Sequence, residues 1–186
     1  MLRILRLCLT TVLLALPVGC ASTQHPEVES AVADLPAYAP EQAALFDDSF
    51  SAEIFGLPYT GPDLARDRQF VERLRTADAV VRTKISTITS DATGLAQSFS
   101  LTLRRIDEPL AGQLTHDFVE LEVHGKNPSV ALVARHQAVL IGKTVIVFLR
   151  DFNDAGQRVT HFRAEADTES VRKAVQSAKM LDDVGS

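Results

Sequence analysis

The spacing of apolar residues along the chain changes from a helical to a strand-like period near residue 79. Before this point, Phe46, Phe50 and Ile54 recur every four residues in a polar stretch that ends at Gly56, which predicts an amphipathic helix over 40–56. A second helix is predicted over 62–77. Its buried stripe would consist of Leu64, Phe70, Val71, Leu74 and Ala77, and its solvated face of Arg66, Asp67, Arg68, Glu72, Arg73 and Arg75.

From residue 80 onward, apolar and polar residues alternate, as they do in a half-buried strand. Residues 80–90, 97–107 and 118–125 are rich in Val, Ile, Thr and Phe and are separated by turn-forming stretches, which predicts three successive antiparallel strands. Residues 144–167 form the clearest predicted hairpin, with two β-rich runs around the turn sequence NDAG.

Two further helical segments flank this hairpin in the prediction. Asn127 is a candidate cap and Gly142 a candidate stop for a buried helix, but the β-branched content leaves residues 128–141 open between helix and strand. Residues 168–180 place small apolar side chains on one helical side, with Asp167 as a candidate cap.

This order of elements predicts the fold class. Strands linked as hairpins, with helices at the ends, predict an α+β fold with an about five-stranded, mainly antiparallel sheet packed with helices. We expect one globular domain over 41–183, preceded by a flexible spacer over 20–40 and followed by a short tail over 184–186. The prolines and small polar residues of the spacer are the basis for the first boundary.

The first 19 residues have the composition of a secretory signal peptide. Arg3 and Arg6 precede the apolar run 7–16, and the small residue Gly19 stands before Cys20. The apolar run has about half the length that a membrane-spanning helix needs. We therefore expect residues 1–19 to be removed rather than to span the membrane.

The sequence LALPVGC at the end of this segment resembles the lipobox of bacterial lipoprotein precursors, with Pro17 in place of the usual aliphatic residue. The resemblance implies that Cys20 becomes the acylated first residue of the mature chain and anchors it to a membrane of the bacterial cell envelope. Ala21, rather than Asp, after the cysteine is similar to lipoproteins of the outer membrane in two-membrane bacteria. The alternative is an ordinary signal peptide that is cleaved nearby and leaves Cys20 free.

Charge and cysteine content narrow the possible partners. Removal of residues 1–19 takes away two arginines and no acid, which changes the formal net charge from −5 to −7. Nucleic acid is therefore not an expected partner, since its phosphates bind basic surfaces. Cys8 would leave with the signal peptide, so Cys20 would be the only cysteine and no intrachain disulfide could form.

The predicted strand 118–125 carries the candidate binding residues. Because side chains alternate along a strand, Glu120, Glu122 and His124 share one polar face, which Arg104 joins from the neighbouring predicted strand. We predict that this polar face binds a small ligand or an envelope protein. One alternative is a divalent cation held by Glu120, Glu122 and His124, which His161 could join if its strand is a neighbour. The other is an ordinary solvated face whose acids pair with bases on adjacent strands. Alternation alone explains the pattern, so we expect no metal ion and no cofactor.

The predicted strand 144–152 has apolar side chains on both sides. Either a helix covers its second side, or Ile146 and Phe148 form the apolar floor of a binding site.

No complete catalytic motif is present in the sequence. Gly142-Lys-Thr144 lacks the upstream glycine of a phosphate-binding loop, and Ser170-Val-Arg-Lys173 lacks the companion motifs of penicillin-binding enzymes. The sequence therefore favours a lipid-anchored extracytoplasmic domain that binds a partner or ligand or supports an envelope assembly, without catalysis. The alternative is a lipid-anchored envelope enzyme, a hydrolase, whose site is assembled from dispersed residues.

Overall fold

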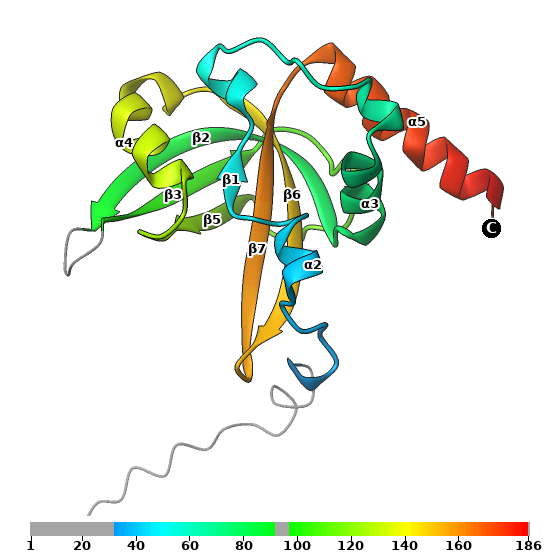
Figure 1. The fold of residues 1–186 in the computed structure, drawn as a ribbon, viewed down its shortest axis with the longest axis horizontal. Coiled ribbons are helices and arrows are strands. Elements are labelled where there is room, and N and C mark those ends of the chain that lie inside the picture. Colours follow the sequence, from blue (N-terminus) through cyan, green and yellow to red (C-terminus); the bar gives the residue numbers. More distant parts are fainter. Residues whose placement is uncertain (1–31, 92–96, 186) are drawn as a thin grey trace, which may run out of the picture.

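The computed structural model describes residues 32–91 and 97–185, with side chains described up to residue 180 near the C-terminus. The predicted signal peptide, Cys20 and most of the predicted spacer lie outside the described residues. Helices lie on both faces of a mixed seven-stranded open sheet, so the α+β prediction is confirmed (Figure 1). In the described part of the chain, no helix has the length and apolar character needed to cross a bilayer.

The sheet has five long strands and two that are only two residues long. The long strands are β2 (Ala79–Asp91), β3 (Ser98–Arg105), β5 (Phe118–Val123), β6 (Thr144–Asp154) and β7 (Gln157–Ala166), and the short ones are β1 (Ser49–Phe50) and β4 (Ala111–Gly112). The order across the sheet is β1-β7-β6-β2-β3-β5, with β4 beside the start of β2. Every pair is antiparallel except β1 with β7.

The β6–β7 hairpin follows from its turn sequence. Asp154 pairs with Gln157, so Ala155 and Gly156 form a two-residue loop, and both have positive φ angles, 50° and 84°. Positive φ at both loop residues matches the twist of the flanking strands, and glycine adopts it without strain. This hairpin extends beyond the rest of the sheet in Figure 1.

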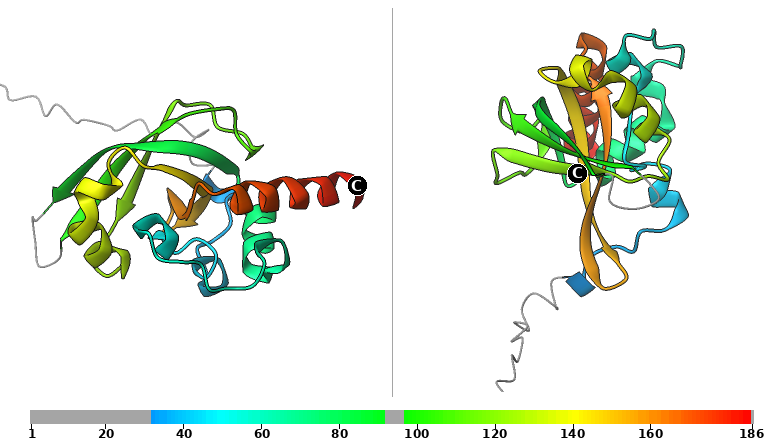
Figure 2. Two further views of the ribbon diagram at one scale, coloured as in Figure 1. Left: turned by 90° about the horizontal axis from the view of Figure 1, so that it is seen from above. Right: turned by 90° about the vertical axis from the view of Figure 1, so that its left-hand side faces the viewer.

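The helical segments are short except for the last one. They are α2 (Pro40–Ala43), α3 (Arg68–Thr76), α4 (Ser129–Leu140) and α5 (Glu169–Gly185), with single 3-10 turns η1 (Ala52–Phe55) and η2 (Leu64–Arg66). The second half of α5 projects away from the sheet (Figures 1 and 2).

The predicted helix over 40–56 is wrong. Only Pro40–Ala43 is α-helical, Asp48 takes a positive φ of 52° that turns the chain, and residues 49–50 then pair with β7 as β1. Phe46, Phe50 and Ile54 are all buried, as the pattern required, but Phe46 packs on one face of the sheet and the other two on the opposite face. Two separate burial surfaces therefore replace one helical stripe.

The second predicted helix is shorter than expected because Asp67 caps it. The Asp67 Oδ1 atom accepts the N–H groups of Gln69 and Phe70 at 2.8 and 3.2 Å, which starts α3 at Arg68. Leu64 is buried from the separate turn η2. Arg73 is 6% exposed, so the prediction that it lies on the solvated face is wrong.

Of the two alternatives left open for residues 128–141, the structure has the helix, α4. The Asn127 side chain accepts the N–H of Ser129 at 2.8 Å, as a cap should. The helix is only partly buried, since Val133 and Leu140 face the core while Leu132 and Val139 are exposed. The cap of α5 is Thr168 rather than Asp167, because the Thr168 hydroxyl accepts the N–H of Val171.

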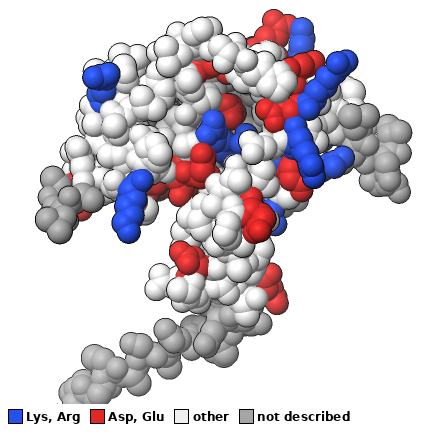
Figure 3. Space-filling view, viewed as in Figure 1, with Lys and Arg blue, Asp and Glu red and all other residues white. Residues whose placement is uncertain are grey.

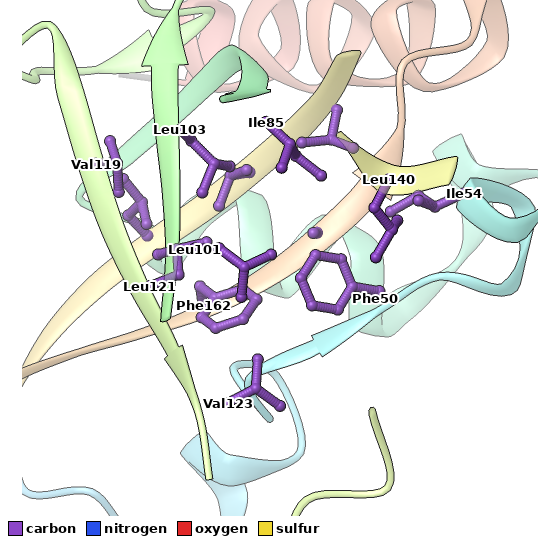
Figure 4. Close-up of a cluster of buried hydrophobic side chains, with 14 of the residues drawn as sticks. Phe50, Ile54, Ile85, Leu101, Leu103, Val119, Leu121, Val123, Leu140 and Phe162 are labelled. Carbon is purple, nitrogen blue, oxygen red and sulfur yellow. The ribbon is translucent and has the colours of Figure 1, made fainter. Parts of the chain in front are cut away.

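Two cores lie on opposite faces of the sheet. The first contains the inward side chains of all five long strands, closed by Phe50, Ile54, Val133 and Leu140 (Figure 4). The second contains Ile146, Phe148 and Phe152 of β6 beneath Phe70 of α3 and Val171 of α5. Figure 1 shows α4 and α3 on opposite sides of the β6–β7 hairpin. Ile146 and Phe148 are fully covered, so the alternative that they form the floor of a binding site is wrong.

Candidate binding site

A cavity of about 590 Å³ opens at one end of the first core, where the start of β2, the β4–β5 loop, β5 and the β6–β7 hairpin meet. The curvature of the open sheet brings β5 into contact with β7. Leu114, Val119 and Leu149 give the cavity an apolar wall, and Phe118 at its rim is 57% exposed. Pockets with apolar walls and a few polar groups are common ligand sites.

The hairpin side of the cavity is fixed by one carboxylate. The Asp151 side chain, 17% exposed, accepts Thr160 Oγ1 at 2.6 Å and Arg158 Nε at 2.9 Å. The Asp151 N–H donates to Asp78 Oδ2 at 2.7 Å, which connects the hairpin to the start of β2. Both oxygens of Asp151 therefore have hydrogen-bond partners on the hairpin.

The β5 side of the cavity carries polar groups with free bonding capacity. Glu120 and His116 line the cavity and are exposed, and neither forms a hydrogen bond or ion pair with any residue that the structure describes. A ligand can therefore bind to these two groups without breaking a contact inside the protein.

The predicted polar face is exposed on the outer side of β2, β3 and β5, and the expectation of a solvated face is confirmed for these residues. Arg104, Glu120, Glu122 and His124 are all exposed, and no helix of the described chain covers them. His124 Nε2 lies 3.3 Å from Glu122 Oε2. Arg82 pairs with Asp107 and Asp167 rather than with a glutamate of β5. Whether this face binds a partner stays a prediction.

The structure does not bring His161 to the polar face. This histidine lies on β7, and its Nδ1 atom is 2.7 Å from Asp48 Oδ2. Among the residues that the structure describes, no three His, Cys, Asp or Glu side chains are arranged to hold a metal ion. His161 therefore does not join Glu120, Glu122 and His124 as a further ligand for a cation.

The Asp48–His161 pair has part of the geometry of a hydrolase, because a carboxylate orients the histidine of a catalytic triad. However, His161 Nε2 is buried, and no hydroxyl in the described chain is bonded to it. Ser170, from the sequence resemblance to penicillin-binding enzymes, bonds to Thr168, and Lys173 pairs with Glu169 on the surface of α5.

A second, smaller cavity of about 270 Å³ lies over a buried charge network on the other face of the sheet. Arg73 donates to Leu45 O at 2.6 Å and to Glu165 Oε1 at 3.2 Å, and its guanidinium lies over the Phe148 ring. Arg163 contacts the same Glu165 oxygen at 3.2 Å. Burial lowers the pKa of Arg73 and raises the pKa of Glu53 at the cavity wall. The network connects α3 to β7, and its groups are largely occupied by one another.

Acidic and basic side chains are interspersed over the face of the molecule in Figure 3. Searches of protein-family models, curated proteins and solved structures found no match to this chain. These comparisons therefore indicate no function for the cavity.

Sequence reasoning found Glu120 but not the cavity beside it. The cavity is lined by Leu35 and by side chains from the segments 78–79, 113–116, 118–120, 149–151, 158 and 160, which only the tertiary structure brings together. One signal was available in the sequence. Phe118 precedes Glu120 by two residues, so alternation places an aromatic ring on the solvated face.

Proposed function

We propose that the protein is a lipid-anchored domain of the bacterial cell envelope that binds a partner or ligand, and that the cavity beside Phe118 is its binding site. The observation that carries this proposal is the cavity itself. Its volume of about 590 Å³ lies within the usual range for ligand pockets, and a large exposed aromatic ring stands at its rim. Aromatic anchors beside pockets dominate many interfaces.

The chemistry of the cavity supports binding rather than turnover. The Asp151 carboxylate bonds to Thr160 and Arg158, the Asp78 carboxylate accepts the Asp151 N–H, and no hydroxyl of the cavity is bonded to a histidine within the described chain. A nucleophile next to a base is the arrangement that hydrolysis requires. The cavity offers instead an apolar wall with Glu120 and His116 at its border.

Site-specific photo-crosslinking in the native cells tests the binding proposal. A photoreactive amino acid in place of Phe118 should give a specific crosslinked product. Leu57 is the matched control, because its side chain is also 57% exposed but lies outside the cavity. Equal crosslinking from both positions, or none from position 118, would contradict the proposed site.

The anchoring part of the proposal depends on Cys20. The wild-type chain should incorporate labelled fatty acid and fractionate with the envelope, and with the outer membrane in a two-membrane host. Cys20→Ser should remain unprocessed or become soluble. Equal labelling of the two chains would rule out lipidation at this residue.

A further inference from the structure

Strand β5 ends the sheet and has an open edge. Arg105 N–H donates to Asp117 O at 2.8 Å, and the pairing of β3 with β5 continues from there without a shift in register. In an antiparallel pair, alternate residues bond to the partner strand. Val119, Leu121 and Val123 therefore bond to β3, and the backbone groups of Phe118, Glu120 and Glu122 point outward. No other strand of the described chain pairs with this edge.

Most of the usual protections of an edge strand are missing from β5. Proteins commonly shield such edges with charged side chains, lysine above all, or with proline, a bulge or a covering helix, and β5 has only the charges of Glu120 and Glu122. Residues 118–123 contain neither lysine nor proline, the register is regular, and no helix contacts appear among the main packing contacts of β5. Six consecutive residues thus present a template on which another strand can form.

The two sides of this edge have different chemistry. On the outer side lie the exposed carboxylates of Glu120 and Glu122 and the exposed ring of Phe118. On the inner side lie Val119 and the apolar wall of the cavity, Leu114 and Leu149. Because side chains alternate, an added strand would place every second residue beside the carboxylates and the residues between them beside the apolar wall.

We propose that β5 binds an extended segment of a partner protein by strand addition, and that this segment alternates basic and apolar residues. The proposal rests on the proposed binding function and names the kind of partner that the same site takes. Basic residues of the segment pair with Glu120 and Glu122, and an apolar residue enters the cavity beside Phe118. Main-chain hydrogen bonds to Phe118, Glu120 and Glu122 provide the part of the affinity that does not depend on the side chains of the segment.

Charge complementarity selects this partner over a second copy of the chain. Two β5 edges side by side would place Glu120 and Glu122 of one copy near the same carboxylates of the other. Like charges on neighbouring strands are destabilising, whereas opposite charges stabilise the pair. A segment with lysine or arginine at alternate positions avoids this repulsion and supplies counterions for both glutamates.

Synthetic peptides test the proposal against the full-length chain in detergent micelles. The probe is a fluorescent Lys-Val-Lys-Val-Lys peptide with blocked ends, and the control peptide has Glu in place of Lys. Two further versions carry N-methyl groups either on every Lys or on every Val. Only alternate residues of an added strand donate to β5, so one N-methyl version should lose about tenfold or more in affinity and the other should still bind.

The protein side of the test uses Glu120→Gln/Glu122→Gln. The loss of two exposed charge pairs should weaken Lys-peptide binding by roughly 2- to 30-fold at low salt. Glu41→Gln/Glu72→Gln makes the same charge change at exposed positions of α2 and α3, outside β5, and should bind as wild type does. Strand addition is wrong if both N-methyl versions bind equally well, if the Glu peptide binds as tightly as the Lys peptide, or if the two double variants behave alike.

Crosslinking from position 118 in cells separates this inference from the binding function. If Glu120→Gln/Glu122→Gln reduces the crosslinked product, the same edge serves the natural partner and the inference is supported. If crosslinking persists at full strength while the peptides fail the tests above, the domain binds by another mode and only strand addition is overturned. If position 118 gives no product at all, the binding proposal and the inference fail together.

Discussion

The ring of Tyr38 stacks face to face on the imidazole of His161, with 3.6 Å between the ring centroids and 5° between their planes. The Tyr38 hydroxyl donates to Phe46 O at 2.6 Å, and Pro36 O accepts the N–H of Asn153 at 2.9 Å. Residues 36–38, which the sequence places in the flexible spacer, are therefore docked on the β6–β7 hairpin. The spacer between the predicted lipid anchor and this docked segment ends before Pro36.

Shortened chains measure the contribution of this segment. A chain that starts at Pro36 should be soluble and unfold cooperatively, because it keeps the Tyr38 stack and the Pro36 hydrogen bond. A chain that starts at Pro40 should lose about 1–3 kcal/mol in free energy of unfolding in urea, since half-buried aromatic packing is removed. Tyr38→Ala in the longer chain should reproduce most of this loss. Equal stability of all three chains would show that the docked segment contributes nothing.

The stability of the domain should depend on the ionisation of Tyr38 at high pH. Burial, together with Asp48 and Asp47, raises the pKa of Tyr38 to about 12. The folded state thus holds the phenolic proton more tightly than the unfolded state, whose tyrosine pKa is about 10. The resulting stability is fully present below about pH 10 and is lost as the pH rises toward 12.

Urea unfolding between pH 9 and 11.5 checks this dependence. Tyr38→Phe should show a smaller loss of stability over this range than the wild-type chain. Absorbance at 295 nm should show one late-titrating phenol that disappears in the variant. Tyr59, whose pKa is also raised by burial, continues to titrate in both chains. Parallel pH profiles for the two proteins would contradict the assignment to Tyr38.

The buried pair of Arg73 and Glu165 should behave as a coupled unit. Glu165→Leu alone should lower the free energy of unfolding by about 3–5 kcal/mol, because it leaves the buried Arg73 without a carboxylate partner. Arg73→Met should cost less, because Glu165 keeps its contact with Arg163. The double variant should be less destabilised than the sum of the two single variants. Lys173→Met breaks an exposed pair with Glu169 and should change stability by less than about 1 kcal/mol. Additive single effects in urea unfolding would show that the two residues act independently.

The start of α3 should depend on the Asp67 side chain. Asp67→Ala removes the acceptor for two helix N–H groups and should lower the free energy of unfolding by about 1 kcal/mol. Asp63→Ala is the control, since Asp63 accepts a single N–H at the short turn η2. The midpoint of urea unfolding should shift more for Asp67→Ala. The reverse order would place the helix start at Pro62, as the sequence pattern predicted.

The long strands could be read from the sequence because burial along a strand is a local property. Each second residue of β3 and β5 faces the same core, so Leu101, Leu103, Val119 and Leu121 reveal the inner side without knowledge of the neighbouring strands. Glu120 and Glu122 were correctly placed on the solvated side for the same reason. Likewise, the turn sequence at Ala155 and Gly156 fixed the hairpin by its own backbone preferences.

Tertiary packing determines the features that the local spacing of apolar residues predicts wrongly. Phe46, Phe50 and Ile54 have helical spacing, yet the sheet buries them on two faces, so the chain turns at Asp48 and forms β1. Arg73 has the sequence position of a surface residue, yet Glu165, 92 residues away, satisfies it inside the protein. The sequence pattern around Arg73 cannot reveal an ion-pair partner that lies so far away along the chain.

Some features of the binding site likewise follow from the local sequence, and others depend on the tertiary structure. Alternation along β5 is intrinsic to its sequence and determines which residues of this strand are exposed. The strand order places β6 beside β2, and β3 between β2 and β5. This order makes β5 the last strand of the sheet. It also makes the edge of β5 border a cavity that the β6–β7 hairpin shares. Strand order is set by the burial of both faces of β6, which involves the whole chain at once.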